Sequence, residues 1–496
     1  MTHFSDILEG DDIYFRDRWQ FEQKYDFLPD PELATNEYTQ DFYFFIPNAL
    51  QINRNTYTIE QFYKDQTNMI RSKTPVFSLK EILDLNNSSS PLARIDGLKD
   101  EEQNTVTQSL IEKEVKLLGN VVRSAIRTNA QELSSLLEQE LYDEFIKGCH
   151  EMCDELEEYQ NTFEGIKKET ADKWDTPSIH KHFEYMTTFL NHVVNQYLIL
   201  LLERIRYSDD QKFQEIDARI TEMLKTTQKM ITDKDLSDKR EGEKIIYRKS
   251  LLNKFFVYAL LLNTDRFSPG QRYQNLTGAI AAGIAMLVFF TLFVWQGQFF
   301  LINSTPFIVI TVFLYILKDR IKEGIKTFTH HRTLGWFSDY TTKIMSPDDK
   351  SVLGVLTEKF SYISEDEIPE EISTIRSREF DSMMEDYKLP ETVMYYTKKM
   401  KINQKPRELE ARRFMLNVIF RFNIRHFMDK ASNPYSPYLW LNEETGEIKV
   451  WHLPKVYHLN IIVRTTTKQP GKKPKKELSK VRIVADKSGI KRIEYP

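Results

Sequence analysis

Cys149 and Cys153, together with His180 and His182, are the residues whose types and spacing come closest to a metal site. Two cysteines four positions apart share one face of a helix, and a neighbouring helix could supply imidazoles for tetrahedral zinc coordination. A simpler interpretation is packing, because Cys149 falls on a regular apolar stripe, where a free thiol behaves as a small hydrophobic group. His180 and His182 flank Lys181 near a predicted helix start, which is typical of an exposed surface. We favour the packing interpretation and keep the four residues as candidate ligands.

Two charged segments are further candidates. The positive charge of the turn 468–476 could attract anionic lipid headgroups. The alternative, which we favour, is a solvated turn in which lysine and proline protect a sheet edge. The lysines concerned are Lys472, Lys473, Lys475 and Lys476. The segment 421–430 carries Arg, His and Asp at spacings of three and four, which predicts an ordinary helix surface.

Sequence patterns that mark known catalytic chemistry are missing. The chain has no phosphate-binding loop, no dinucleotide glycine motif, no H-E-x-x-H zinc motif, no EF-hand loop and no G-x-S-x-G nucleophile elbow. The sequence therefore identifies no catalytic residue, and we expect no cofactor.

These candidates are arranged around one uncharged stretch, residues 276–317, which contains no Asp, Glu, Lys, Arg or His. A run of this length is typical of membrane segments and is long enough to cross a bilayer twice. We predict spans at 276–296 and 299–317, with Pro306 as a kink in the second. A shallower hairpin that enters only one leaflet is the alternative.

The predicted hairpin carries residues suited to helix packing and to the two lipid interfaces. Small residues four positions apart let two helices approach closely, and aromatic and basic side chains prefer the headgroup layers. The packing candidates are Gly278, Ala279, Ala282 and Gly283, and the interface candidates are Trp295 and Phe299 at the tip and Lys318 and Arg320 at the base. Arg266 and Arg272 precede the stretch, so both flanks are basic and both termini are predicted to be cytoplasmic.

Composition bounds the class of protein. The chain has 496 residues and a net charge of −5, so no overall positive field predicts binding to nucleic acid. Its two cysteines cannot form a disulfide framework, which is typical of a reducing compartment. The acidic first residues lack the apolar core of a signal peptide, so we expect insertion through the internal hairpin.

The remaining patterns predict an α+β fold that is mostly α. Apolar residues at heptad spacing from Phe145 to Ile166 predict either a coiled-coil-like helix or the buried stripe of a bundle helix. Thr176 and Pro177 form a helix start, and 245–262 is expected either to lie in the bilayer interface or to pack in the bundle. We predict five units. Residues 1–90 form a small α+β unit with a hairpin at 41–57, residues 98–262 form a helical bundle, and residues 263–330 contain the two-helix transmembrane hairpin and its stalk. Residues 331–432 are predicted to be helical, and residues 433–496 to form a small antiparallel β domain.

Three functions follow from these expectations. We favour a non-enzymatic, membrane-anchored cytoplasmic scaffold that binds partner proteins or copies of itself while the hairpin holds it at the lipid bilayer. The first alternative is an oligomeric two-helix membrane effector or channel, in which several hairpins surround a pathway. The second is an enzyme acting at the membrane surface whose active-site residues leave no recognisable motif.

Overall fold

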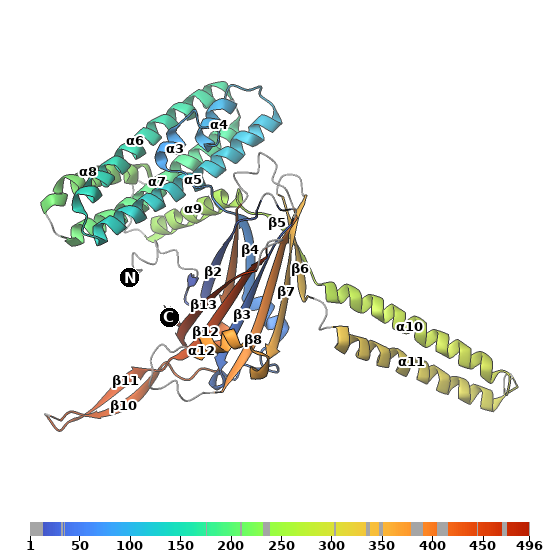
Figure 1. Cartoon of the computed structure of the whole chain (residues 1–496). Helices are drawn as coiled ribbons and strands as arrows, with labels where there is room; N and C mark the ends of the chain where they lie inside the picture. Colours follow the sequence, from blue (N-terminus) through green and yellow to red (C-terminus); the bar gives the residue numbers. More distant parts are fainter. Residues whose placement is uncertain are drawn as a thin grey trace.

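The computed structural model describes residues 13–495 apart from 31–32, 34, 175, 209–210, 232–238, 302–303, 334–337, 347–350, 378–389, 404–414, 444 and 469–473. Over these residues the chain is α+β, as predicted. Two stacked antiparallel sheets form the centre, a helical bundle lies at one end of them, and two elongated pairs of elements project outward (Figure 1).

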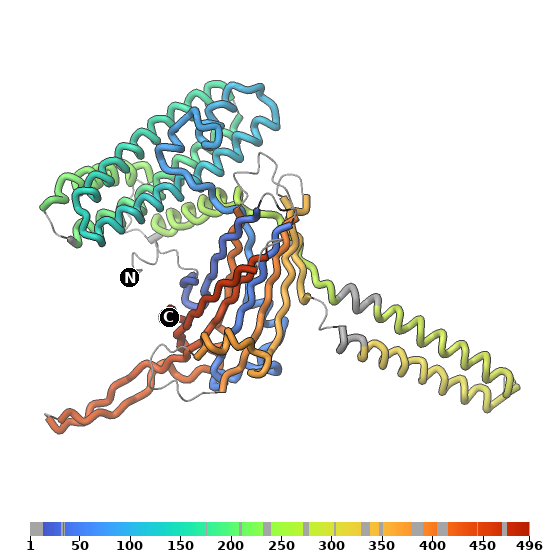
Figure 2. Tube along the Cα trace, in the orientation of Figure 1, coloured from blue at the N-terminus to red at the C-terminus, as the bar shows by residue number. Residues whose placement is uncertain are grey.

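The larger sheet has eight strands in the order β14-β13-β12-β3-β8-β7-β6-β5. Their bounds are β14 Gly489–Glu494, β13 Lys475–Asp486, β12 Tyr457–Lys468, β3 Asn36–Pro47, β8 Glu391–Ile402, β7 Val352–Ile363, β6 Tyr340–Met345 and β5 Asn263–Phe267. In the centre, Phe44 of β3 pairs with Ile461 of β12 on one side and with Met394 of β8 on the other. Chain segments from both ends of the sequence therefore form one sheet, as the adjacent blue and red tubes in Figure 2 show.

This pairing corrects two of the predicted units. Residues 1–90 do not form a unit of their own, because β3 is continued by C-terminal strands, and residues 433–496 are equally not a separate β domain. The C-terminal strands themselves were predicted correctly. The N-terminal hairpin was not: β3 (Asn36–Pro47) is longer than predicted, and 50–57 forms turns instead of a strand.

The smaller sheet has four strands in the order β1-β2-β9-β4 and packs on the larger one. Its bounds are β1 Ile13–Phe15, β2 Gln20–Phe27, β9 Leu416–Asn423 and β4 Gln66–Ser72. Aromatic rings fill the space between the sheets: the ring centroids of Phe42 and Phe420 lie 4.6 Å apart, and those of Phe62 and Phe360 4.1 Å apart. The two sheets thus make a β-sandwich with an aromatic core.

The prediction of a helical region at 331–432 is wrong. Most of its described residues lie in the strands β6, β7, β8 and β9. Between the end of α11 (Thr305–Thr333) and residue 432, the described α-helix is α12 (Glu370–Ser377), which has eight residues. In β9, Val418, Phe420 and Phe422 face the sandwich core while Ile419, on the opposite face, is also buried. Because both faces are covered, the apolar alternation that marks a half-buried strand is lost.

The helical bundle consists of α3–α9 and was predicted correctly in its main features. Its bounds are α3 Leu79–Leu83, α4 Pro91–Leu98, α5 Thr105–Glu138, α6 Tyr142–Lys173, α7 Pro177–Ser208, α8 Gln214–Ile231 and α9 Lys239–Tyr258. The heptad-spaced residues of α6 from Phe145 to Ile166 are buried in the common bundle core. Leu252 and Phe256 place α9 in the same core, so 245–262 packs in the bundle.

Both large helical parts are insertions in the sandwich. The bundle begins after β4 and ends before β5, and its two ends meet where the Ser72 amide donates to the Leu260 carbonyl at 2.7 Å. The second insertion lies between the paired strands β5 and β6 and consists of α10 (Pro269–Gln296) and α11 (Thr305–Thr333). We call α10 and α11 the arm; they lie side by side and project from the sandwich (Figure 1).

The arm differs from the predicted hairpin in its second half. α11 begins at Thr305 instead of residue 299, after Ser304, whose hydroxyl accepts from the Phe307 amide at 3.4 Å. Its uncharged part is therefore 305–317, about 20 Å at 1.5 Å per residue, against about 30 Å for a hydrocarbon core. In the part of the chain that the structure describes, Thr277–Gln296 alone is a helix long and apolar enough to cross a membrane.

Candidate functional site

A buried carboxylate, Glu358 on β7, is the centre of a polar cluster in the sandwich. It is 1% exposed. Its Oε1 accepts from Gln66 Nε2 at 2.8 Å, Asn68 Nδ2 at 2.7 Å and the Tyr396 hydroxyl at 2.7 Å, while Oε2 lies 3.2 Å from an Arg266 guanidinium nitrogen. A buried carboxylate is tolerated where partners of this kind replace its water shell.

Arg266 extends the cluster toward the edge of the sandwich. Its guanidinium carbon lies 4.1 Å from the ring centroid of Tyr340 and 5.2 Å from that of Tyr63. The Tyr63 hydroxyl donates to Asp339 Oδ2 at 2.8 Å, and the Phe360 amide donates to the same oxygen at 2.7 Å. Burial raises the pKa of the Asp339 carboxyl, although both of these hydrogen bonds oppose the shift.

This cluster lies at the root of the arm. Arg266 is on β5, just before α10 begins at Pro269, and Asp339 follows α11, which ends at Thr333. Both chain ends of the insertion are thus tied to the sandwich through charged side chains. We call Tyr63, Gln66, Asn68, Arg266, Asp339, Tyr340, Glu358 and Tyr396 the root cluster.

Lys398 lies beside the root cluster in the sandwich core and is 0% exposed. Its Nζ lies 5.1 Å from the ring centroid of Phe42 and 5.3 Å from that of Phe420. Among the described residues this nitrogen has no hydrogen-bond partner. Burial lowers the pKa of Lys398 to about 7, against the opposing influence of the Glu358 charge. The core therefore contains an amine that titrates near neutral pH.

The contacts of the root cluster connect the arm to the sandwich. Both oxygens of Glu358 are engaged by protein donors, and the guanidinium of Arg266 is held between that carboxylate and two rings. These contacts fix the orientation of Glu358 and Arg266, whereas the buried amide oxygens of Gln66 and Asn68 have no hydrogen-bond partner among the described residues. Sequence reasoning missed the cluster because Arg266 resembles a membrane-flanking charge and Glu358 interrupts the apolar pattern of its strand.

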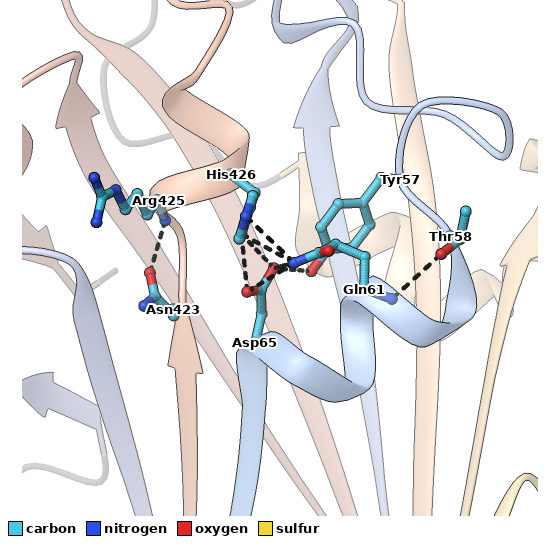
Figure 3. A network of polar contacts seen from close by, with 7 residues as sticks. All are labelled: Tyr57, Thr58, Gln61, Asp65, Asn423, Arg425 and His426. Carbon is cyan, nitrogen blue, oxygen red and sulfur yellow. Dashed lines mark hydrogen bonds and ion pairs between the residues drawn. The ribbon is translucent and has the colours of Figure 1, made fainter.

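A second network joins the two sheets at α2 (Ile59–Asp65) and is drawn in Figure 3. Asp65 accepts from the Tyr57 hydroxyl at 2.8 Å, and its Oδ1 lies 2.9 Å from His426 Nδ1 and 3.2 Å from Gln61 Nε2. A histidine oriented by a carboxylate can act as a general base. Here His426 lies just after β9 and contacts Asp65 at the end of α2, so the pair connects these two elements. The hydroxyl that contacts the pair in Figure 3 is that of Tyr57, which donates to Asp65. The segment 421–430 was predicted to be a helix surface; this is wrong, because Arg421 lies on β9 and pairs with Glu22.

The candidate zinc ligands are not brought together. Cys149 and Cys153 point into the bundle core, where burial raises the pKa of both thiols, that of Cys153 to about 11. Zinc binds the thiolate, so these environments disfavour coordination. His182 contacts the Ser178 carbonyl oxygen at 2.7 Å and the Phe255 ring, and His180 is half-buried. No group of three or more His, Cys, Asp or Glu in the described part of the chain could hold a metal ion.

The small residues of α10 divide between the two sides of the arm. Ala281 and Ala285 are buried and Ala282 is half-buried, whereas Ala279 and Gly283 are exposed. A Cβ atom at Gly278 or Gly283 would meet nothing within 4 Å. The contact with α11 therefore uses Ala281 and Ala285, which the prediction did not include, and leaves Ala279 and Gly283 uncovered.

The two helices of the arm meet again near its tip. Gln296 Nε2 donates to Thr311 Oγ1 at 2.7 Å, and the rings of Phe293 and Phe307 are 5.7 Å apart. Trp295 and Phe299 are 59% and 65% exposed, with ring centroids 5.1 Å apart. A hollow of about 420 Å³ lies here, lined by Leu292, Trp295, Gln296, Phe299, Phe300, Ile310 and Leu314.

Some of the basic residues predicted to contact lipid lie beside an aromatic ring or a carboxylate of the same chain, and others are exposed. At the base of the uncharged stretch, Lys318 Nζ lies 3.9 Å from the Tyr315 ring centroid, and Arg320 is exposed. Near the C-terminal turn, Lys475 pairs with Glu477 at 2.7 Å and Lys476 with Glu371 at 3.3 Å. Lys472 and Lys473 lie outside the described residues. These ion pairs reduce the positive charge that β13 presents to an anionic surface.

Comparison with known proteins gives no assignment. The chain matches no protein-family model, no curated protein and no solved structure. Function has to be argued from the arm, the root cluster and the surfaces of the two folded parts.

Proposed function

We propose that this protein is a membrane-anchored scaffold, in which the arm enters a lipid bilayer and the sandwich and bundle remain on one side of it to bind other proteins. The observation that carries the proposal is α10: Thr277–Gln296 has a mean hydropathy of 2.2, and only 11% of its most apolar window is buried. The core helix of a water-soluble protein has similar composition but is mostly covered by its own chain.

The exposed side chains of the arm support lipid as the surrounding medium. Leu287 and Phe313 are each 69% exposed, and Val294 is 63% exposed. Transferring apolar surface out of water stabilises by about 25 cal/mol per Å², so several such side chains together favour the hydrocarbon core strongly. A patch of this size on a water-facing surface would otherwise promote aggregation.

We further propose two passes with both flanks on the cytoplasmic side. The uncharged part of α11 covers about 20 Å of a core of about 30 Å, so the apolar tip residues must supply the remainder, together with long side chains at the base. Lys318 and Arg320 are suited to this, because long basic side chains extend to the headgroups while their stems stay in the apolar layer. Trp295 and Phe299 then lie in the far headgroup layer.

The root cluster gives the arm a defined direction. Arg266 and Asp339 flank the two helices in sequence and are held by Glu358 and Tyr63 in the sandwich. A joint made from engaged charges resists bending more than a flexible linker does. In this proposal, the cluster fixes how the sandwich and bundle stand on the membrane and therefore which surfaces face cytoplasmic partners.

Membrane fractionation tests the proposal. We expect the wild-type chain to stay with membranes after alkaline carbonate washing, and the variant I284R/L287R to move to the supernatant, because both positions are exposed near the centre of the span and each arginine there costs about 3 kcal/mol on insertion. V106R is the matched control, since Val106 is 67% exposed on α5 of the bundle. Wild-type protein in the supernatant would refute the anchoring.

Thiol labelling tests the number of passes. We expect Q298C, at the tip, and K487C, in the exposed turn before β14, to react with a membrane-impermeant maleimide from opposite sides of sealed vesicles. The native Cys149 and Cys153 are buried and provide a low background. Labelling of both sites from the same side would show an arm that enters only one leaflet.

One observation favours the channel alternative as a second candidate. Ala279 and Gly283 form a small-residue pair on the side of α10 that α11 does not cover. In lipid, such a pair allows a helix of a second copy to approach closely. Ion flux across liposomes containing the wild-type chain, lost in A279L/G283L, would support an oligomeric channel, and flux equal to that of empty liposomes would exclude it.

A further inference from the structure

A two-stranded ribbon projects from the sandwich at a place distant from the arm (Figure 1). It is formed by β10 (Tyr435–Leu441) and β11 (Ile448–Pro454), and every residue of both strands is exposed. Leu439 is 68% exposed and Ile448 72%. An isolated two-stranded ribbon is at best marginally stable in water, so its sequence has to be explained by contacts beyond this chain.

Both faces of the ribbon are mainly apolar, with Ser436 and Lys449 as polar residues on one face and His452 on the other. One face is aromatic, with Tyr438 opposite Trp451 and with the rings of Tyr438 and Trp440 stacked at 6.4 Å. The other face is aliphatic, with Leu439 opposite Val450 and Leu441 opposite Ile448. Contiguous apolar surface of this kind on a soluble part of a protein marks an interaction site.

We propose that the ribbon is the contact between two copies of this chain, in which β11 pairs antiparallel with β11 of the second copy. In the described part of the chain β11 has one strand neighbour, β10, so its outer edge is unpaired. From Ile448 to Leu453 that edge contains no proline and offers its backbone amides to a further strand. The edge of β10 is interrupted by Pro437, which has no N–H group.

Charge supports a second copy as the occupant and sets the register. A two-fold axis through Trp451, the middle residue of β11, pairs the strand with itself and confines its one proline, Pro454, to the two ends of the pairing, opposite Ile448. In this register, Glu447 lies opposite Lys455 of the second copy, and the symmetry repeats the pair at the other end. Glu447 and Lys455 are both exposed in the single chain. The ribbon therefore carries an acidic residue at its tip end and a basic residue at its base, which antiparallel pairing brings together.

A lipid surface fits the ribbon less well. The unpaired edges of β10 and β11 have backbone groups that hydrocarbon cannot satisfy. Glu443 and Glu447, both exposed, flank the turn that would have to enter the membrane first. In Figure 1 the ribbon and the arm project from the sandwich in different directions. Pairing between two copies gives hydrogen-bond partners to the backbone groups at the edge of β11 and places Glu447 opposite Lys455.

Charge exchange in the full-length, detergent-solubilised protein tests the pairing. We expect wild type to be a dimer by light scattering, E447K and K455E each to weaken the dimer about tenfold, and E447K/K455E to recover wild-type affinity. The control is K487E, which makes the same change in an exposed turn outside the ribbon. Because Glu447 and Lys455 are exposed, these variants are expected to keep the wild-type circular dichroism spectrum. A wild-type monomer, or a double variant that stays weak, would overturn the proposal.

Cysteine cross-linking tests the register independently of the arm. W451C places two thiols at the axis, within disulfide distance, and should give covalent dimers under mild oxidation. V450C should give few, since residue 450 would lie opposite residue 452 of the second copy. Equal cross-linking of both variants would overturn the register. If a dye attached to the thiol of W451C shifted its emission to the blue when phosphatidylcholine vesicles were added to monomeric protein, the ribbon would lie in lipid and the proposal itself would be overturned.

Discussion

Buried threonines in the bundle and the buried carboxylate in the sandwich find their hydrogen-bond partners at very different distances along the chain. In the bundle, the Thr170 hydroxyl donates to the Ile166 carbonyl oxygen at 2.7 Å, one helical turn away. In the sandwich, Gln66 donates to Glu358 at 2.8 Å across the two sheets, nearly 300 positions away in the chain. The first kind of contact forms within a helix on its own. The second exists only after the sheets have stacked, so the sandwich depends on a few distant polar pairs.

This contrast implies different responses to substitution. A bundle built on local apolar periodicity should lose stability in proportion to the packing removed. The sandwich should in addition react to the removal of single charged groups and to pH, because Glu358 and Lys398 are both almost inaccessible to water. Three predictions follow in order of expected size.

Glu358→Ala should have the largest effect. It leaves Gln66, Asn68 and Tyr396 without their common acceptor and Arg266 without its carboxylate, and breaking a buried pair in this way costs about 3–5 kcal/mol. Hydrogen exchange followed by mass spectrometry should show faster exchange in β4, β7 and β8. Exchange in α5 and α6 of the bundle should stay at the wild-type rate.

Glu358→Gln is the matched control for this substitution. The amide keeps one oxygen acceptor but loses the charge that faces Arg266, so its effect should be clearly smaller than that of alanine. If both variants exchanged at wild-type rates in β4 and β7, the root cluster would not hold the sheets together. If α5 and α6 were affected equally, the two parts would unfold as one unit and the contrast would fail.

The same contrast separates what the sequence predicts from what it does not. The bundle helices follow from signals that are visible in the sequence: Ser78 and Glu81 form a capping box at the start of α3, and α7 begins at the predicted Pro177. The C-terminal strands were also predictable, because turns and β-branched residues mark them. By contrast, the partner of each strand depends on distant pairing, such as Phe44 with Ile461, and no local pattern encodes it.

The root cluster was beyond sequence reasoning for a related reason. A strand with Glu358 at an inward position contradicts the rule that charges lie outside, and only the partners reveal why it is tolerated. The apolar stretch could be found, since composition alone marks it. The start of α11 was missed although Ser304, Thr305 and Pro306 are typical of a helix start, because a helix beginning at residue 299 has the length that a bilayer span requires.

Lys398→Met should stabilise the sandwich at neutral pH and remove part of its pH dependence. The pKa of Lys398 is lowered to about 7 in the folded chain, whereas an unfolded lysine titrates at about 10.4. Between these values the unfolded state binds a proton that the folded state does not. The free energy of unfolding should therefore rise with pH by up to about 1.4 kcal/mol per unit in wild type, and this stabilisation is lost as the pH falls through about 7.

This slope is measured by denaturant unfolding between pH 7 and pH 9, with hydrogen exchange in the sandwich strands as the readout. The methionine variant should be more stable by about 2 kcal/mol at pH 7, because a buried amine without a hydrogen-bond partner is replaced by an apolar group of similar size. Asp339 acts in the opposite sense, because its pKa is raised in the folded chain. Its contribution to the free energy of unfolding is complete at a pH below the pKa of the unfolded chain, and it is lost as the pH rises through the pKa of the folded chain. A variant with the wild-type slope would show that Lys398 is not the titrating group.

Gly119→Ala should give the smallest effect and tests the bundle alone. A Cβ atom at Gly119 of α5 would lie 2.4 Å from a ring carbon of Phe256, so α5 and α9 would have to separate or the buried ring would have to turn. Such overpacking costs about 1–3 kcal/mol, and the better helix propensity of alanine offsets about 1 kcal/mol of it. Gly165→Ala on α6 is the matched control, since nothing lies within 4 Å of its Cβ position and alanine should stabilise it. A stabilising Gly119→Ala would mean that the contact between α5 and α9 is looser than the burial of Phe256 indicates.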